Sequence, residues 1–225
     1  MSLDPQTLGQ IEALTSTGGI SDGSDERPLL VLDVDDVVLH FVGPLLRFFE
    51  AQNAQLRLST FRLFGNVFDA TTGTALDNAR VSQMLGSFFD TQGDWQTLVD
   101  GAPEAISAIA QHAEVVLLTA MPHRYRDTRR VFLDQLGLPY PLLTTEMAKG
   151  PAIHHLRGET GRAVAFVDDM PHNLVSARQE VTDSHLFHLI ADNSLRKLVP
   201  APPQDATIVM DWNEAGERIA AVLKI

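Results

Sequence analysis

The chain has 225 residues, with 17 Lys and Arg against 29 Asp and Glu, a formal net charge of −12 and no cysteine. This length suits one core domain with a small second lobe. The acidic balance disfavours a duplex nucleic-acid partner, and the missing cysteines exclude disulfides, thiolate nucleophiles and cysteine-based metal sites. The N-terminus lacks a signal-peptide pattern and no apolar run reaches about 18 residues, so we expect a cytoplasmic protein without a membrane partner.

The first 27 residues have the pattern of a peripheral segment. A short helical pattern over residues 6–14 runs into a stretch rich in Gly, Ser and Asp at residues 18–26. Such sequences are typical of turns and linkers. We therefore predict a flexible N-terminal segment over residues 1–27 and a core that begins at residue 28.

Strand and helix patterns alternate through the rest of the chain. Apolar runs typical of buried parallel strands end at polar residues, over residues 29–32, 115–118, 163–167 and 207–210, with weaker runs at 142–144 and 185–190. Helical patterns cover residues 103–112, 125–136, 151–156, 173–180 and 212–223. The alternation predicts an α/β fold, with a Rossmann-like, mainly parallel sheet and helices on both faces. Ligands in such folds bind at the carboxyl ends of the strands.

One interval is too long for this alternation. Eighty-six positions separate Asp33 from Thr119, whereas a simple strand–helix–strand unit needs about 30 residues. The interval holds eight of the eleven phenylalanines, and helical patterns around residues 45–49 and 79–89. We therefore predict a small helical cap over residues 40–99, inserted after the first strand, with the core formed by residues 28–39 and 100–225.

Two carboxylates directly follow the first strand. Asp33 and Asp35 are two positions apart, so in an extended or tightly turned segment they can face the same side. Two carboxylates on one side can perform different tasks on one substrate. The alternative is a strand-end turn in which the aspartates cap backbone amides.

Three further polar features follow the later strands in order. Thr119 ends the second strong strand, where its hydroxyl and the next amides can hold a phosphoryl oxygen. Lys149 follows by 30 positions, at a Gly-Pro helix start, and the other two lysines come after the last motif. Asp168 and Asp169 end the next strand. Each alone is consistent with a cap, a solvated lysine or a turn, but their order favours a common site.

Together these features resemble the motifs of the haloacid dehalogenase (HAD) superfamily of phosphohydrolases. The first motif, an apolar strand followed by D-x-D-x-T/V, matches residues 29–38. The second matches Thr119, the third Lys149 and the fourth Asp168-Asp169, so the resemblance covers about residues 29–190. A long insertion after the first motif is similar to the cap of many members. The sequence departs from the family at Asp36, where glycine is frequent.

The resemblance implies the roles of four residues in catalysis. Asp33 is the expected nucleophile, which forms an aspartyl-phosphate, and Asp35 protonates the leaving oxygen and later activates water. Thr119 would hold the phosphoryl group, and Lys149 would neutralise it while restraining Asp33. Because dehalogenases need no acid for a leaving halide, the carboxylate of Asp35 favours hydrolysis of a phosphate ester.

The resemblance also implies a Mg²⁺ cofactor. Mg²⁺ prefers oxygen ligands and keeps several waters, which suits the Asp33 carboxylate, the Asp35 main-chain carbonyl and a carboxylate from Asp168 or Asp169. A cation is needed there because so many carboxylates would otherwise repel a phosphate dianion.

Further residues near the second motif and in the cap are candidates for substrate contacts. A basic cluster follows Thr119 near the expected mouth of the site, although the arginines at 126, 129 and 130 are at least as typical of an exposed helix face. Cap phenylalanines either stack on a base or, more commonly, form the core of the lobe. The predicted substrate-binding residues are Thr119, Ala120, His123, Arg124, Lys149, Phe41 and Phe49.

The sequence therefore predicts a Mg²⁺-dependent phosphatase that acts on a small phosphorylated metabolite. A similarity to 5′(3′)-deoxyribonucleotidases, in the aromatic cap and the basic residues after the second motif, leaves a nucleotidase as an alternative. A second alternative is a non-catalytic module that keeps the fold and a metal or phosphate site. The sequence leaves open whether the chain forms a homodimer.

Overall fold

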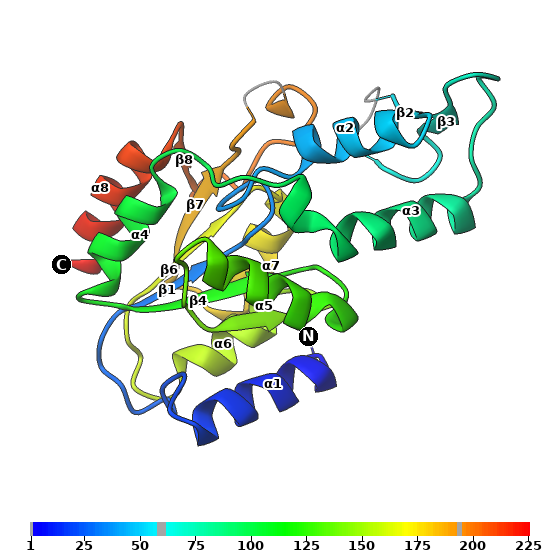
Figure 1. Cartoon of the computed structure of the whole chain (residues 1–225). Coiled ribbons are helices and arrows are strands. Elements are labelled where there is room, and N and C mark those ends of the chain that lie inside the picture. Colours follow the sequence, from blue (N-terminus) through cyan, green and yellow to red (C-terminus); the bar gives the residue numbers. More distant parts are fainter. Residues whose placement is uncertain (1, 58–61, 193–194) are drawn as a thin grey trace.

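A six-stranded parallel sheet forms the centre of the molecule (Figure 1). The computed structural model describes residues 2–57, 62–192 and 195–225. The strand order is β5-β4-β1-β6-β7-β8, and every neighbouring pair is parallel. The strands are β1 (Leu29–Leu32), β4 (Glu114–Thr119), β5 (Leu142–Thr144), β6 (Val164–Asp168), β7 (His185–Leu189) and β8 (Thr207–Val209). The predicted α/β fold with a Rossmann-like sheet is confirmed.

Helices cover both faces of this sheet. On one face lie α4 (Ala102–Ala110), α5 (Arg126–Gln135) and α8 (Trp212–Leu223), and on the other lie α1 (Pro5–Ser16), α6 (Gly150–Arg157) and α7 (Pro171–Glu180). Side chains alternate along a strand, so Leu30 and Leu32 of β1 pack on the first face, whereas Leu29 and Val31 pack on the second. All four side chains are fully buried. This burial on both faces explains why the sequence of β1 is a continuous apolar run.

The predicted cap is a separate lobe that projects from the core at the upper right of Figure 1. It contains α2 (Val42–Ala51), β2 (Ala54–Leu56), β3 (Val67–Asp69), α3 (Asn78–Asp90) and the 3₁₀ turn η1 (Gln92–Asp94). The strands β2 and β3 pair as an antiparallel hairpin, so the described part of the lobe contains a short hairpin beside the two helices that were predicted. Residues 58–61, with Phe61, lie outside the described residues. The domain boundaries themselves stay predictions.

Four of the lobe's phenylalanines form its own core. Phe48, Phe49, Phe88 and Phe89 are all buried. Their rings meet edge-on or tilted, with centroid distances of 6.1 Å for Phe48–Phe49, 5.5 Å for Phe48–Phe88 and 5.9 Å for Phe88–Phe89. Met121 of the core domain packs into the same cluster. The lobe is therefore anchored next to the carboxyl end of β4.

The N-terminal segment differs from the flexible segment that we predicted. Helix α1 packs against the sheet edge at β5: the Thr7 hydroxyl donates to the main-chain oxygen of Thr144 at 2.7 Å, and Asp4 accepts from the Glu146 amide at 3.0 Å. Ile11 is buried in the same face. These partners lie more than 130 positions away in the chain, so local sequence pattern gives no sign of them.

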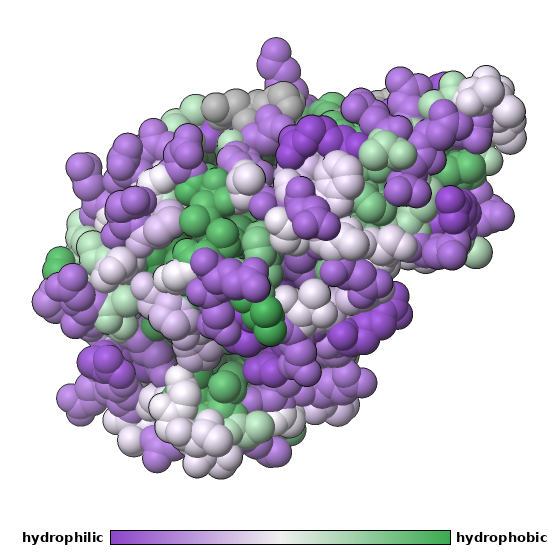
Figure 2. All heavy atoms as spheres, viewed as in Figure 1, coloured by the Kyte–Doolittle hydropathy of each residue, from purple (hydrophilic) through white to green (hydrophobic). Residues whose placement is uncertain are grey.

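The viewed face of the molecule is mainly hydrophilic, with hydrophobic residues in separate patches over the core and the lobe (Figure 2). None of the helices in the described ranges combines the length and the apolar character needed to cross a membrane.

Candidate active site

Three of the predicted site residues end neighbouring strands of the sheet. Thr119 ends β4, Asp33 follows β1 and Asp168 ends β6, and these strands lie side by side in the order β4-β1-β6. The Asp33 amide donates to the Val167 oxygen at 2.9 Å, which continues the β1–β6 ladder up to the nucleophile candidate. The parallel topology thus brings residues from 33, 119 and 168 to one edge.

Lys149 links two of these carboxylates. Its Nζ lies 2.6 Å from Asp33 Oδ1 and 2.7 Å from Asp168 Oδ2, and its side chain is fully buried. Burial alone would lower the pKa of Lys149, but the negative charges of Asp168 and Asp33 outweigh it and raise the pKa. The lysine is therefore a fixed positive charge beneath the site.

The close approach of two helices places Lys149. Gly150 begins α6 directly after the lysine, and its amide donates to Ser176 Oγ on α7 at 3.0 Å. A Cβ added at Gly150 would lie only 2.2 Å from the Ser176 main-chain oxygen. A glycine at this position thus lets α6 pack closely enough on α7 to bury the lysine.

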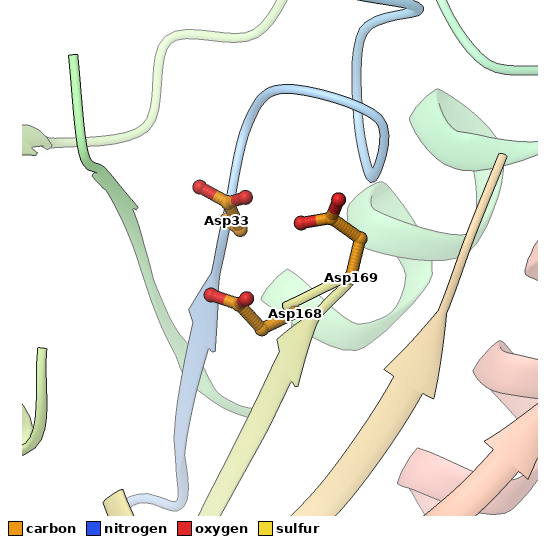
Figure 3. Close-up of side chains that lie close together, drawn as sticks. All are labelled: Asp33, Asp168 and Asp169. Atoms are coloured by element: carbon orange, nitrogen blue, oxygen red, sulfur yellow. The ribbon is translucent and has the colours of Figure 1, made fainter. Parts of the chain in front are cut away.

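Asp33, Asp168 and Asp169 form a carboxylate cluster at the ends of β1 and β6, with their side chains turned toward one another (Figure 3). One oxygen from each lies within 4.8 Å of the others. Burial raises the pKa of Asp33 to about 7, with Lys149 opposing the shift and the Asp168 charge adding to it. Burial and the Asp33 charge likewise raise the pKa of Asp169 well above its usual range. Such a cluster of oxygen donors fits a hard divalent cation, which would relieve the repulsion.

The two aspartates at the end of β6 differ in their contacts. Asp168 accepts hydrogen bonds from Lys149, from Asn173 Nδ2 at 3.0 Å and from the Met170 amide at 2.8 Å. Within the described residues, the Asp169 carboxylate makes no such hydrogen bond, and it lines the cavity above the cluster. Asp169 is therefore the better placed of the two to ligate a cation, and Asp168 to hold Lys149.

Asp35 is held by residues that the sequence analysis missed. Arg129 of α5 is fully buried and contacts both Asp35 oxygens, at 3.0 and 3.4 Å, and Gln96 Nε2 donates to Asp35 Oδ1 at 2.9 Å. Of the two positions left open for Arg129, near the mouth of the site or on an exposed helix face, the exposed face is wrong. The signal against exposure was its spacing of three and four positions from Phe132 and Leu133, which places it on the buried stripe of the helix.

Asp36, the departure from the HAD pattern, has a φ of 56°. This left-handed region favours glycine, so an aspartate here carries a backbone cost. The aspartate gives something that glycine lacks: its Oδ1 accepts from the Phe41 amide at 2.9 Å and its Oδ2 from the Val42 amide at 3.2 Å, at the start of α2. It thus ties the turn after Asp35 to the first lobe helix.

A cavity of about 290 Å³ lies between the strand ends and the lobe. Its polar wall contains Asp33, Asp35, Asp36, Thr119, Asp169, His172 and Asn173. The other described residues on its wall are apolar apart from Arg62: Phe41, Val42, Leu45, Leu56, Leu63, Phe89, Ala120, Met121 and Met170. The predicted contacts Thr119, Ala120 and Phe41 therefore face one space with the carboxylates.

The other four predicted substrate contacts do not line this cavity: Lys149 is fully buried against Asp33 and Asp168, and the remaining three lie elsewhere. Phe49 is fully buried, because it is on the face of α2 that forms the lobe core. His123 is turned toward α1, with Nε2 2.9 Å from Asp4 and Nδ1 2.7 Å from the Thr144 hydroxyl. Arg124 is exposed, and its guanidinium lies over the Tyr125 ring at 4.7 Å. The basic cluster thus contributes to packing rather than to the cavity wall.

Solved structures with a similar fold cover most of the chain. One is YfnB from Bacillus subtilis, provisionally described as a HAD-hydrolase and bound to magnesium, with a TM-score of 0.61 and 16% identity over 89% of this chain and 100% of that chain. Another, from Haemophilus somnus, is described as a predicted phosphoglycolate phosphatase, with a TM-score of 0.59 and 12% identity over 87% and 99%.

A third, a HAD family hydrolase from Deinococcus radiodurans with bound phosphate and sodium, has a TM-score of 0.57 and 13% identity over 88% of this chain and 97% of that chain. No family model and no curated protein matches this sequence. In these three comparisons the likeness covers 87–89% of this chain. The chain therefore has the fold of the haloacid dehalogenase superfamily, and the four motifs that predicted this resemblance lie at one edge of its sheet.

Proposed function

We propose that this protein is a Mg²⁺-dependent phosphatase that hydrolyses a small phosphate monoester through an aspartyl-phosphate on Asp33. The observation that carries the proposal is the placement of Asp33: its carboxylate lies at the base of the cavity, 2.6 Å from Lys149, with Asp35 lining the same space. A nucleophile, a second carboxylate and a buried cation at one strand edge are what phosphoryl transfer to an aspartate requires.

The residues that would hold Mg²⁺ are the carboxylates of Asp33 and Asp169 and the main-chain carbonyl of Asp35. Bound there, the cation would neutralise the phosphoryl oxygens and orient them toward Asp33. Asp168 is committed to Lys149 and Asn173, so it positions the lysine in this proposal.

In the first step, an Asp33 oxygen attacks phosphorus and the bond to the leaving oxygen breaks as Asp35 gives that oxygen a proton. In the second step, Asp35 takes a proton from a water molecule, which attacks phosphorus and releases inorganic phosphate and the Asp33 carboxylate. Lys149 stays charged throughout because two carboxylates surround it. The Thr119 hydroxyl, on the cavity wall, holds a phosphoryl oxygen during both steps.

The test is release of phosphate from an aryl phosphate, with Mg²⁺ and with a chelator. Asp33→Asn should abolish the Mg²⁺-dependent release. Asp90→Asn, an exposed position at the end of α3, is the matched control and should keep full activity. Undiminished turnover in Asp33→Asn would contradict the mechanism.

Asp35→Asn tests the second carboxylate separately. An aryl leaving group needs little protonation, so Asp33 should still be phosphorylated in this variant, whereas the water step loses its base. We expect a burst of released phenol followed by slow turnover, with a phosphorylated protein seen by mass spectrometry. A nucleotidase and a non-catalytic module stay alternatives: hydrolysis confined to nucleotides would select the first, and complete inactivity the second.

A further inference from the structure

The cavity above Asp33 has two unlike ends. The end at the strand edge carries the carboxylates, Thr119 and Asn173. The end formed by the lobe and the loop after β4 is built from aliphatic, aromatic and thioether side chains, among them Phe41, Leu45, Phe89 and Met121. A phosphate ester that places its phosphorus at Asp33 must therefore direct its leaving group toward an apolar wall.

This apolar wall is held in place by the packing behind it. Leu45 is 2% exposed, Phe89 4% and Met121 2%, and all three belong to the lobe core. Phe41 lies against Phe89 with nearly parallel rings, 6.1 Å between centroids and 25° between planes. Protein cores are close-packed, so these side chains have no room to move aside. A ligand in the cavity therefore meets an apolar wall and not polar groups from behind it.

Among the described residues, few side chains at this end could be polar partners for a leaving group. Among the described lobe residues on the cavity wall, Arg62 is the one with a polar side chain, and it is exposed to solvent. A sugar or glycerol moiety placed against the apolar wall would lose water from its hydroxyls without gaining hydrogen bonds, at a cost of about 1–3 kcal/mol for each unpaired group. An apolar group there would instead gain from leaving water.

We propose that the substrate is a phosphate monoester of an apolar alcohol or phenol, with an uncharged leaving group of a short alkyl chain or a single ring. The cavity volume of about 290 Å³ lies at the small end of the range for ligand pockets, which limits the size of that group. The inference rests on the proposed phosphatase function for the position of the phosphorus, and it adds the chemistry of the group that leaves.

Binding of non-hydrolysable phosphonates tests the inference without relying on turnover. In the presence of Mg²⁺, calorimetry on the full chain would compare methyl-, propyl- and pentylphosphonate. The expected dissociation constant falls about fourfold for each added methylene until the cavity is full. A dissociation constant independent of chain length, or the absence of any binding, contradicts the inference.

Two polar phosphonates distinguish the other substrate classes. 2,3-Dihydroxypropylphosphonate tests a polyol leaving group, and 3-phosphonopropionate tests a distal anion that pairs with Arg62. Both should bind at least tenfold more weakly than propylphosphonate. Equal or tighter binding of either one overturns the apolar assignment.

Hydrolysis of the matching esters separates this inference from the proposed function. Propyl, pentyl and glycerol phosphates have leaving alcohols of similar intrinsic reactivity, so differences in kcat/KM report the cavity. Phosphonate binding that follows chain length, with no ester hydrolysed, would overturn the proposed function and with it the substrate assignment, and would leave only the apolar binding preference of the cavity. Hydrolysis that depends on Asp33, with kcat/KM independent of chain length, would support the proposed function and overturn the inference.

A pair of neighbouring variants locates the effect in the cavity wall. Leu45→Ala should move the chain length at which affinity stops rising to a longer phosphonate, because it removes a lining side chain. Leu46→Ala, the next residue on α2, packs on the lobe without lining the cavity and should keep the wild-type dependence. The same optimum in both variants contradicts the placement of the leaving group beside Leu45; if Leu45→Ala fails to fold, the phosphonate series on the unmodified chain decides.

Discussion

Arg129 contacts both oxygens of the Asp35 carboxylate, with Nη1 3.0 Å from Oδ1 and Nη2 3.4 Å from Oδ2. The guanidinium also donates to Gln92 and Gln96, in and just after η1. Its side chain is fully buried, whereas that of Asp35 is 19% exposed. The carboxylate proposed as acid and base is thus held from behind by α5 and by the segment that connects the lobe to α4, with its exposed part toward the cavity.

Replacing this arginine should affect turnover more than binding. We expect Arg129→Met to lower kcat by about 10- to 100-fold with KM little changed, since a misplacement of about 1 Å in a catalytic group can cost 100-fold. Steady-state kinetics on an aryl phosphate measure both constants. Arg126→Met, on the same helix but bonded to the Leu142 oxygen, is the control. Normal kcat in a folded Arg129→Met protein would show that Asp35 needs no such support.

The contact between Arg129 and Asp35 also predicts that the single variant Asp35→Ala is less stable than the double variant that adds Arg129→Met. Asp35→Ala leaves the buried Arg129 cation without its carboxylate, which should lower the free energy of unfolding by about 3–5 kcal/mol. Adding Arg129→Met to Asp35→Ala removes the unpaired charge and should recover most of that loss. Urea denaturation of the wild type, the two single variants and the double variant gives the coupling free energy. Strictly additive effects would contradict a direct ion pair.

Mg²⁺ binding should depend on pH through the carboxylate cluster. Burial raises the pKa of Asp33 to about 7, above its ordinary value of 3.8, so its contribution to stability is present below 3.8 and is lost as pH rises through about 7. The metal-free protein should lose stability over that window. Because Mg²⁺ requires the deprotonated carboxylate, its affinity should rise from pH 6 to pH 8, with protons released on binding at pH 6.

Thermal denaturation with Mg²⁺ and with a chelator, at pH 6 and pH 8, checks this dependence. At one hundred times the dissociation constant, Mg²⁺ should stabilise the fold by about 2.7 kcal/mol. Asp169→Asn should remove most of this gain, whereas Asp90→Asn should keep it. A Mg²⁺ effect that is absent at pH 8, or that is larger at pH 6, would contradict the assigned ligands.

The order of strands and helices was predictable because the signals are local. Strands such as β1 lie buried on both faces and are continuous apolar runs, and helices such as α6 and α7 begin with Pro in the first turn. Asp33, Thr119 and Asp168 were singled out as site candidates for the same reason, whereas Lys149 was singled out because the other two lysines follow the last motif. A polar residue that ends an apolar strand marks the functional edge of a parallel sheet without any long-range information.

The missed features depend on contacts between distant parts of the chain. β2 and β3 have three residues each, too few for a recognisable alternation. The Asp4–His123 contact joins residues 119 positions apart. The sequence therefore could not predict that α1 packs on the sheet edge or that His123 points away from the cavity. The burial of Arg129 is a partial exception, because its position on the apolar stripe of its helix is visible in the sequence. A charged side chain is nevertheless expected to be exposed, so the burial was not predicted.

Gly150 should be the glycine whose replacement most disturbs the site. A methyl group there would lie 2.2 Å from the Ser176 main-chain oxygen, and backbone cannot turn aside as a flexible side chain can. Gly150→Ala must therefore move α6 away from α7 and carry Lys149 with it. We expect a loss of at least about 2 kcal/mol in the free energy of unfolding, together with a lower kcat.

The matched control is Gly9→Ala, because it makes the same chemical change in a helix where nothing lies within 4 Å. Gly9 is exposed in the middle of α1, so alanine there should stabilise the protein by about 0.5–1 kcal/mol. Urea denaturation and phosphatase assays on both variants decide the matter. If Gly150→Ala is as stable and as active as the wild type, the close approach of α6 to α7 is not what positions Lys149.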